Sequence, residues 1–396
     1  MINTKKKDDI IDENDIPKSV RKMKHAREKA DLVEEKKKNR KKKIRKLIFF
    51  FLIILALFFI IKLAISAHRW KMLAKDMLVN EHSVILDSDG TIIATLGDEK
   101  KKEKISYDSI PKNLKNAYVA IEDERFYSHS GIDIKRTAAA SASYILHFGS
   151  SSFGGSTITQ QLVKNLTGDS SDKISRKVKE WWKAWQLESC TSKEEILCAY
   201  LNNIYVGPNI YGVEAGAKYY FSKSASDLSL EECAFLAGIN HSPNSYNPFV
   251  NDDISEKISK RSKLVLGKMK EFSYISNQEY DEAVSNLDSG LKFQKGAIEA
   301  GSHVYSYHTD ALISQVTKEI ADKYKISETF ATNYLELAGA KIYSTQISSV
   351  QKEIETEFEK TKYSLASKNG GSSSQAAMVV IDHKCGYIVG CARWVR

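Results

Sequence analysis

A run of 21 residues, 47–67, constrains this chain more than any other feature, because all of them except Lys62 are apolar or small. At about 1.5 Å of rise per residue, roughly 20 such residues cross the hydrocarbon core of a bilayer. The run therefore predicts a transmembrane helix, from which Lys62 can reach the headgroups through its flexible stem. The alternative is a cleaved signal peptide, since residues 64–66 resemble a cleavage site. The charged region before the run is 46 residues long, which is too long for a signal peptide, so we expect an uncleaved anchor.

The positive charge of the chain is confined to its first 46 residues. They carry 18 Lys and Arg against 9 Asp and Glu, whereas the rest of the chain holds 41 of each. A basic segment before a membrane span is kept in the cytoplasm, which predicts a single pass through the cell membrane with everything after about Trp70 outside the cytoplasm. Nucleic acid is not an expected partner, because no basic face interleaved with aromatic residues follows the span.

The part beyond the span has the apolar spacing of a mainly α fold. Residues 83–94 are expected to form a short hairpin around an Asp-Gly turn. Helical spacing then dominates from Pro111 to Leu287, with a capping box in residues 191–195 and an almost wholly apolar helix over 230–239. Strand signals are scarce in that segment.

The pattern changes after about Asp288. Residues 360–374 are rich in Ser, Gly and Lys, which is typical of a linker, and residues 375–390 predict a β-hairpin. A lone hairpin is not stable by itself, so the chain is expected to stop just inside a further domain. The five cysteines form no CxxC or CxxH pattern, and neither a disulfide framework nor a protein metal site is expected.

The first candidate catalytic residue is Glu122, which opens the run Glu-Asp-Glu-Arg-Phe-Tyr-Ser-His-Ser-Gly. Phe126 and His129 follow at i+4 and i+7, which predicts one shared helical face. An apolar ring beside the carboxyl group would raise the pKa of Glu122 by desolvation and make it a base near neutral pH. The alternative is a surface helix whose acidic residues are only solvated. We expect His129 to be a hydrogen-bonded structural residue.

The second candidate region is polar and follows a glycine-rich stretch over residues 149–155. Glycines there allow backbone N–H groups to approach a ligand closely, although the P-loop pattern is absent. The candidate ligand-binding residues are Ser156, Thr157, Gln160, Gln161, Lys164 and Asn165. The alternative is an ordinary surface loop.

Arg176 and Glu180 lie at i and i+4, which predicts a helix salt bridge. Beside them Trp181, Trp182 and Trp185 are either core residues or an anchor at the membrane interface. A carboxylate among hydroxyl, amide and ammonium groups suits sugar transfer from a phosphorylated donor.

Five motifs in order and at matching spacing resemble the family 51 peptidoglycan glycosyltransferases, which form the N-terminal half of class A penicillin-binding proteins. These motifs are EDERFYSHSG, GGSTITQQLVKN, RKVKE, KEEILCAYLNNIYVG and KRSKLVLGKM, and the similarity covers roughly residues 85–272. Residues 338–346 and the QAAMVVID segment resemble the linker and first strands of that family's transpeptidase domain.

The resemblance implies a lysozyme-like α domain with a small membrane-facing lobe around residues 149–156. Glu122 matches the glutamate that deprotonates the acceptor sugar, and Glu180 matches the carboxylate that orients the donor or its metal, which allows for Mg²⁺ or Mn²⁺ with the donor pyrophosphate. The residues implied in substrate binding are Ser156, Thr157, Gln160, Gln161, Lys164, Asn165, Arg176, Lys177 and Arg261.

The chain departs from the family pattern at two positions. Cys198 stands where the family usually has Glu, and Asp172 stands where it has a basic residue. An SxxK pattern occurs at residues 289–292, but KTG is absent from the sequence, so this chain is not expected to acylate penicillin.

The expected organisation is a cytoplasmic tail (1–46), a transmembrane helix (47–67), a glycosyltransferase domain (75–290), an α/β linker region (291–374) and the start of a truncated transpeptidase domain (375–396). The expected function is polymerisation of lipid II into glycan, with inversion and release of undecaprenyl pyrophosphate. The expected partners are lipid II, the nascent glycan, the membrane and a cell-wall synthesis complex. Two alternatives stay open: a lysozyme-like lytic enzyme, and a non-catalytic scaffold that binds lipid II.

Overall fold

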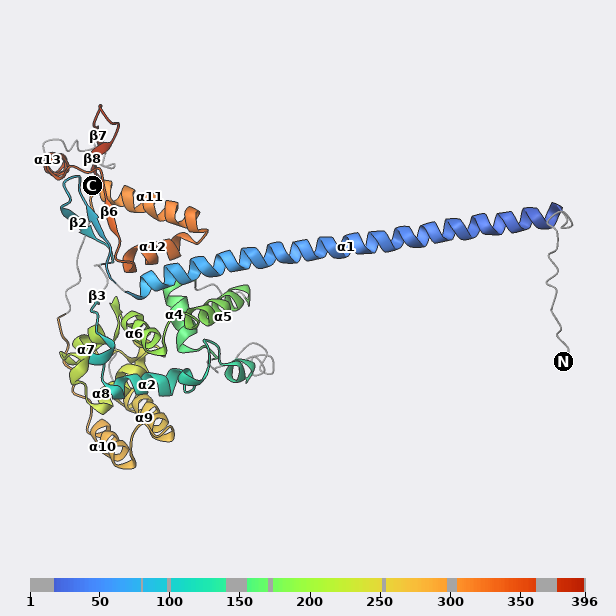
Figure 1. Ribbon diagram of the computed structural model, residues 1–396. Helices are drawn as coiled ribbons and strands as arrows, with labels where there is room; N and C mark the ends of the chain where they lie inside the picture. Colours follow the sequence, from blue (N-terminus) through green and yellow to red (C-terminus); the bar gives the residue numbers. More distant parts are fainter. Residues whose placement is uncertain are drawn as a thin grey trace, which may run out of the picture. The chain divides into compact units, whose positions relative to one another are not determined.

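The computed structural model describes residues 18–79, 81–97, 101–139, 155–169, 174–250, 254–297, 305–360 and 376–394. The chain forms two compact units, Met1–Ser66 and Ala67–Arg396 (Figure 1). Several sequence predictions lie outside the described residues: the first part of the basic tail, most of the loop over 149–156, Asp172, and nearly all of the segment over 360–374.

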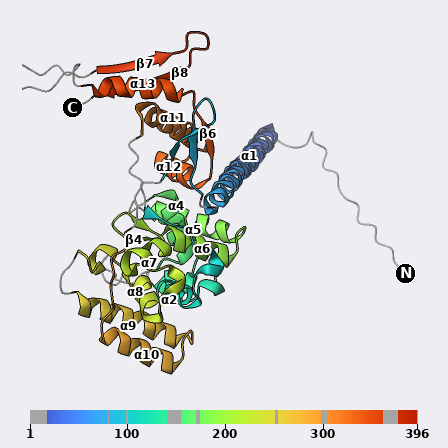
Figure 2. The same cartoon turned by 90° about the vertical axis from the view of Figure 1, so that its left-hand side faces the viewer.

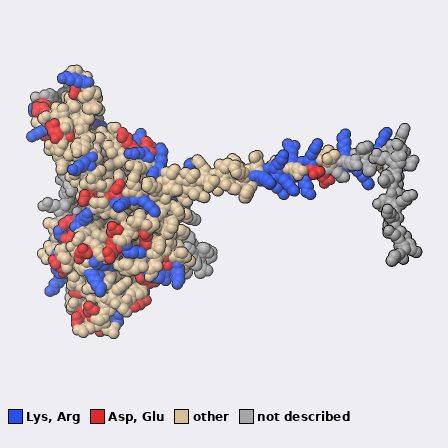
Figure 3. All heavy atoms as spheres, viewed as in Figure 1, with Lys and Arg blue, Asp and Glu red and all other residues tan. Residues whose placement is uncertain are grey.

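The first helix, α1 (Lys18–Leu78), contains the predicted membrane span. Within its stretch Leu32–Leu78 it is long and apolar enough to cross a membrane. The apolar side chains from Leu47 to Ile61 are exposed, which in water would be strongly unfavourable. Figure 3 shows Lys and Arg side chains gathered on one stretch of α1 and an adjoining stretch without them.

The second unit is mainly helical, as predicted. Its first part holds eight of the helices, which the views in Figures 1 and 2 both show packed around one another. They are α2 (Lys112–Glu122), α4 (Ile158–Thr167), α5 (Ile174–Glu188), α6 (Lys193–Asn203), α7 (Val213–Phe221), α8 (Leu230–Ile239), α9 (Ser255–Glu271) and α10 (Asn277–Asp288). A small sheet of β3 (Lys101–Lys102), β5 (Ile210–Tyr211) and β4 (Tyr205–Gly207), in that order, lies beside them.

Local sequence explains where several of these helices begin. Ser192, Ser229 and Ser276 are N-caps, and each forms a capping box with the Glu three residues later. Such a box satisfies two backbone donors that a helix start otherwise leaves unpaired. The predicted capping box over 191–195 and the predicted apolar helix over 230–239 are both confirmed.

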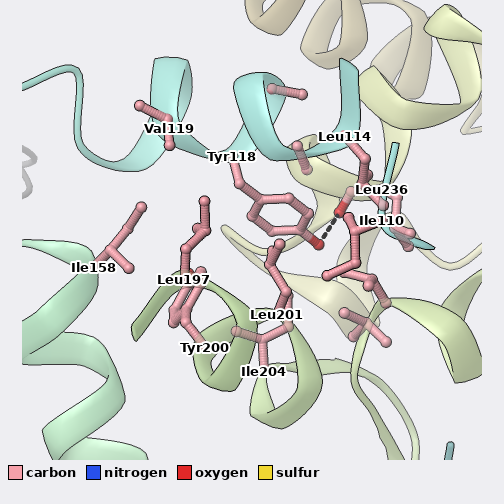
Figure 4. Packing of buried hydrophobic residues seen from close by; sticks show 14 of the residues in the cluster. Ile110, Leu114, Tyr118, Val119, Ile158, Leu197, Tyr200, Leu201, Ile204 and Leu236 are labelled. Carbon is pink, nitrogen blue, oxygen red and sulfur yellow. Dashed lines mark hydrogen bonds between the residues drawn. The ribbon is translucent and has the colours of Figure 1, made fainter. Parts of the chain in front are cut away.

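The main core lies between α2, α4, α6 and α8. Figure 4 shows the Tyr118 ring among Leu114, Leu197 and Leu201, with its hydroxyl group directed at the backbone of Leu236. That hydroxyl donates to the Leu236 carbonyl at 2.9 Å. A buried polar atom is therefore satisfied, and α2 is fixed against α8.

The predicted hairpin over residues 83–94 is confirmed as β1 (Val84–Leu86) and β2 (Ile92–Thr95). The Asp87 carboxylate accepts from the backbone N–H groups of Asp89 and Thr91, and Gly90 has a φ of +83° in the turn. What the sequence did not reveal is a third strand, β6 (Lys341–Tyr343), which pairs in parallel with β1.

The region predicted as an α/β linker is built of ordered helices with β6. They are α11 (Tyr307–Tyr324), α12 (Glu328–Leu337) and α13 (Ser348–Glu359). The predicted C-terminal hairpin is confirmed as β7 (Ala376–Ile381) and β8 (Ile388–Trp394). The Gln351 carboxamide of α13 exchanges two hydrogen bonds with the Cys391 backbone of β8, so the hairpin does not stand alone.

Helix α12 joins this second region to the first. Asn333 Nδ2 donates to the carbonyls of Asn165 at 3.3 Å and Leu166 at 3.2 Å in the last turn of α4. The Phe330 ring packs against Trp70, with 5.7 Å between centroids. Because the last carbonyls of a helix lack intrahelical partners, Asn333 caps α4 from outside.

Helix α5 is held at the same junction. The Lys183 ammonium lies 4.9 Å from the ring centroid of Trp70 and 5.2 Å from that of Phe330. Trp70 Nε1 donates to the Lys183 carbonyl at 3.0 Å. Burial lowers the pKa of Lys183 to about 8. Of the tryptophans on α5, Trp185 is exposed, which leaves both the core and the interfacial role open for this group.

Candidate active site

Glu122 is the last residue of α2, and both of its carboxylate oxygens are held by amide side chains. Gln161 Nε2 on α4 donates to Oε2 at 2.8 Å, and Asn240 Nδ2, which follows the end of α8, donates to Oε1 at 2.9 Å. Three helices therefore fix the orientation of one partly exposed carboxylate. Neutral amides orient it without adding a positive charge beside it.

Tyr200 on α6 orients the two amides. Its hydroxyl donates to Gln161 Oε1 at 3.1 Å and accepts from Asn240 Nδ2 at 3.0 Å. Burial, together with the nearby charge of Glu122, raises the pKa of Tyr200 well above its usual value. Tyr200 therefore remains a neutral donor, and its bond to Oε1 of Gln161 leaves Nε2 of that amide directed at Glu122.

The backbone leaves the helix directly after Glu122, which corrects the predicted helical face with Phe126 and His129. Asp123 is the C-cap, with φ of −155°, and residues 126–128 form a 3-10 turn. The Asp123 carboxylate is fully buried and accepts from His129 Nε2 and from the backbone N–H of Ile158, each at 3.0 Å. His129 is thus structural, as predicted, and Asp123 ties the loop after Glu122 to the start of α4.

The same loop is closed by an ion pair. Arg125 donates through Nε and Nη2 to the two oxygens of Asp133, at 2.7 and 2.9 Å. Burial alone would raise the pKa of Asp133, but Arg125 and the backbone N–H of Arg136 hold it below its usual value. The Arg136 guanidinium donates in turn to the Glu122 carbonyl at 2.5 Å.

The second carboxylate, Glu180, lies with three of the predicted binding residues. Arg176 Nη1 donates to Oε2 at 2.5 Å, and the Lys177 ammonium donates to Oε1. Lys177 also donates to the Ser156 hydroxyl at 2.7 Å. Glu180 is 5% exposed, and these two cations are its partners inside the protein. The predicted salt bridge between Arg176 and Glu180 is confirmed.

Helix α4 connects the two carboxylate groups. Ser156 lies just before its N-cap and contacts Lys177, whereas Gln161 lies in its second turn and contacts Glu122. Lys164 is exposed and lies one turn after Gln161 on the same helical face. The first two turns of α4 thus border a carboxylate held by amides and a carboxylate held by cations.

Residues 89–270 match the Transglycosylase family. This match identifies a transglycosylase domain in the chain. Penicillin-binding protein 1A of Clostridium tetani is 41% identical over 277 residues, which are 69% of this chain and 35% of the relative. Penicillin-binding protein 1A/1B of Bacillus subtilis is 39% identical over 277 residues, or 69% of this chain and 28% of that protein.

This chain therefore spans about a third of the length of these curated relatives. A solved structure of penicillin-binding protein 1A from Haemophilus influenzae is similar at 20% identity with a TM-score of 0.30, over 74% of this chain and 33% of that one. The fold described above rests on the elements of this chain alone. With its apolar first helix, the chain is a membrane-anchored protein with a transglycosylase domain.

Two predicted binding residues of the transglycosylase domain have structural contacts instead. Thr157 and Gln160 are 0% exposed. Thr157 caps α4 by accepting from the Gln160 N–H at 3.1 Å, and its hydroxyl donates to the Gly131 carbonyl at 2.8 Å. Contact with a substrate is not open to these two side chains in this structure, because both are enclosed by protein.

Two others have their described contacts with groups other than Glu122 and Glu180. Asn165 borders a cavity beside α12. Arg261 Nε on α9 donates to the Gly238 carbonyl at 3.0 Å, in the last turn of α8 and two residues before Asn240. Arg261 thus supports the segment that holds Glu122.

The departure at Cys198 is accommodated inside the domain. Asn202 Nδ2 lies 3.5 Å from its sulfur, and burial raises the pKa of the thiol. Cys198 is therefore a protonated packing residue.

A divalent cation does not fit Glu180 as the side chains lie, because Arg176 and Lys177 already engage both oxygens. Among the described residues, no group of three or more His, Cys, Asp or Glu side chains is placed to hold a metal ion.

Sequence reasoning missed Asn240 and Tyr200 as members of the site. Tyr200 reads as one more apolar position of α6, and 118 residues separate Asn240 from Glu122. One signal in the sequence could have indicated Asn240: it is a polar residue directly after the apolar run of α8, and a helix end leaves backbone groups in need of partners.

Proposed function

We propose that this chain is an inverting peptidoglycan glycosyltransferase that joins lipid II units into glycan and releases undecaprenyl pyrophosphate. The observation that carries the proposal is the Glu122 carboxylate, held through both oxygens by Gln161 and Asn240 inside a transglycosylase domain. A carboxylate fixed in this way presents its remaining lone pairs in one direction, as a general base must.

In the proposed reaction Glu122 accepts the proton of the acceptor sugar hydroxyl as its oxygen attacks the anomeric carbon of the donor. The bond from that carbon to the diphosphate oxygen breaks, and the leaving group takes the electron pair. The two amide donors keep the carboxylate oriented toward the acceptor, so that less reorganisation is needed at the transition state.

The departing diphosphate requires positive charge. Arg176 and Lys177 bring a guanidinium and an ammonium group to this part of the site, beside Glu180. Groups of this kind bind phosphate oxygens well. The exposed ammonium of Lys164 on the neighbouring helix α4 adds a further cation.

The membrane anchor agrees with a lipid-linked substrate. We infer that the basic tail remains in the cytoplasm by the positive-inside rule, which places the transglycosylase domain at the outer face of the cytoplasmic membrane. A substrate carried on a polyprenyl chain stays in the same bilayer. The enzyme and its substrate then encounter each other by diffusion within the plane of the membrane.

Product length tests the proposal against a lytic enzyme. Purified full-length chain in detergent is incubated with fluorescent lipid II, and separately with preformed glycan strands, and the products are separated by gel electrophoresis. We expect the chain to lengthen glycan from lipid II and to leave preformed strands intact. Glu122→Gln should produce no glycan from lipid II and should also leave preformed strands intact. Shortening of preformed strands would favour a lytic enzyme, and binding of lipid II without turnover would favour a scaffold.

A further inference from the structure

Helix α12 follows the transglycosylase domain in the sequence, yet it contacts the helix that carries Gln161. Figures 1 and 2 both show α12 beside α4. Asn333 Nδ2 on α12 donates to the carbonyls of Asn165 at 3.3 Å and Leu166 at 3.2 Å. Asn165 lies one turn after Gln161 on α4. A segment outside the domain therefore holds a helix of the Glu122 site.

The end of α4 uses this contact to satisfy its backbone. The last four carbonyls of a helix have no intrahelical partner. The N–H of Gly168, the C-cap, donates to the Lys164 carbonyl at 2.9 Å, and Asn333 serves the next two carbonyls from one nitrogen. Loss of the Asn333 amide would take a donor from both carbonyls and loosen the last turn of α4.

Helix α12 also packs closely against the same turn. Gly168 has a φ of +63°, and a Cβ there would lie 2.6 Å from Cγ2 of Thr329. A side chain at this position would collide with α12, so the glycine allows the two helices to approach. Thr329 and Asn333 are one turn apart on α12 and share the face that contacts α4.

The other contacts of α12 are made with the last turns of α1. Phe330 is 3% exposed, and its ring centroid lies 5.7 Å from that of Trp70. The Tyr334 hydroxyl donates to Asp76 Oδ2 at 3.0 Å. Trp70 and Asp76 both belong to α1. Helix α12 thus connects the end of the membrane-anchoring helix with the end of α4.

The start of α4 is fixed from inside the transglycosylase domain. Thr157 caps it, and the Ile158 N–H donates to the buried Asp123 carboxylate at 3.0 Å. Gln161 lies between this attachment and the one to α12. Two attachments at opposite ends of α4 therefore fix where Gln161 points.

The position of Gln161 matters because its Nε2 donates to Glu122 Oε2 at 2.8 Å. Helix α4 has ten residues, or about 15 Å of length, so a displaced last turn also displaces Gln161 one turn earlier. A misplacement of about 1 Å can lower the rate of an enzyme by about a hundredfold. The contact between α12 and α4 is thus able to affect the orientation of the base.

We propose that Asn333 is a positioning residue for the Glu122 base and acts on it through α4 and Gln161. This inference rests on the proposed function. It makes the region after the transglycosylase domain, together with the end of α1, part of what determines the rate of sugar transfer.

A double-mutant cycle tests whether Asn333 acts through Gln161. The full chain in detergent polymerises fluorescent lipid II, and kcat and KM are determined separately. We expect Asn333→Ala to lower kcat about tenfold and to leave KM within about twofold, because Gln161 orients a group that acts in the transition state. In a Gln161→Ala background, where Asn240 still holds Glu122, Asn333→Ala should have no further effect. An equal loss of kcat in both backgrounds, or a change in KM alone, overturns the proposal.

Two more variants separate the amide group from the rest of α12. Asn333→Asp keeps the size of the side chain and loses both N–H donors, so its kcat should fall at least as far as that of Asn333→Ala. Thr332→Ala is the matched control at the neighbouring, exposed position of α12 and should keep the kcat of the wild type. Wild-type kcat in Asn333→Asp, or an equal loss in Thr332→Ala, overturns the proposal.

Hydrogen exchange followed by mass spectrometry gives a readout that needs no turnover. In Asn333→Ala we expect the amides of α4 to exchange about tenfold faster, as for the loss of one hydrogen-bonding group, and those of α9 to exchange as in the wild type. Unchanged exchange in α4 overturns the proposal even if kcat falls. Absence of turnover in the wild type contradicts the proposed function, and the exchange of α4 then decides by itself whether Asn333 holds this helix.

Discussion

Replacement of Asp123 by Ala should strongly destabilise the transglycosylase domain, because it leaves two buried donors without an acceptor. The carboxylate is fully buried and accepts from His129 Nε2 and the Ile158 N–H. A hydrogen bond to a charged group contributes about 1.5–3 kcal/mol, so the loss of two predicts about 3–6 kcal/mol. For a domain of roughly 200 residues this corresponds to a fall in Tm of about 6–24 °C.

Thermal unfolding followed by circular dichroism in detergent measures this effect. Asp123→Asn keeps an acceptor oxygen for the Ile158 N–H, so its loss of stability should be about half that of Asp123→Ala. Asp281→Ala on α10 is the matched control, since its side chain is exposed and its loss should change Tm by less than about 2 °C. The reasoning is refuted if Asp123→Ala unfolds within about 2 °C of the wild type, or if Asp281→Ala is equally destabilised.

Two further changes test the surroundings of the site. Gly131 has a φ of +85°, and a Cβ there would lie 2.6 Å from the Ala184 backbone of α5. Gly131→Ala should therefore lower the urea midpoint of unfolding markedly. Gly267→Ala is the control, because nothing lies within 4 Å of a Cβ at that position, and it should not lower the midpoint. Burial lowers the pKa of Lys183 to about 8 from 10.5, so the unfolded chain binds more protons between those values and stability should rise with pH across that window. Lys183→Met should flatten this rise in Tm between about pH 8 and 10.5, and an unchanged pH profile would contradict the burial of the ammonium.

The sequence was sufficient to predict those elements whose structure depends on residues close together in the chain. The capping box at Ser192 and the apolar run of α8 were read from the sequence because a helix start and a buried helix each need particular residues in a short window. Thr157 shows the limit of the same reasoning. A hydroxyl group after a glycine-rich stretch suits either a ligand or a helix N-cap, and the structure uses it as a cap.

Contacts between distant segments could not be predicted in this way. Strand β6 pairs with β1 across more than 240 residues, and no local pattern specifies that partner. Asn240 reaches Glu122 only because α8 and α2 pack together in the core. The predicted helical face of Glu122, Phe126 and His129 was wrong for a related reason. Helix α2 ends at Asp123, whose carboxylate accepts from the backbone N–H of Ile158, 35 residues later in the sequence.

The most direct test of the account is the rate at which Glu122→Gln polymerises fluorescent lipid II, measured with its affinity for the same substrate. The glutamine side chain keeps the size of Glu122 and can still accept from Gln161 or Asn240, but it cannot take a proton. The account predicts bound lipid II and a loss of turnover of at least about a hundredfold. Turnover close to that of the wild type would contradict the assignment of Glu122 as the base.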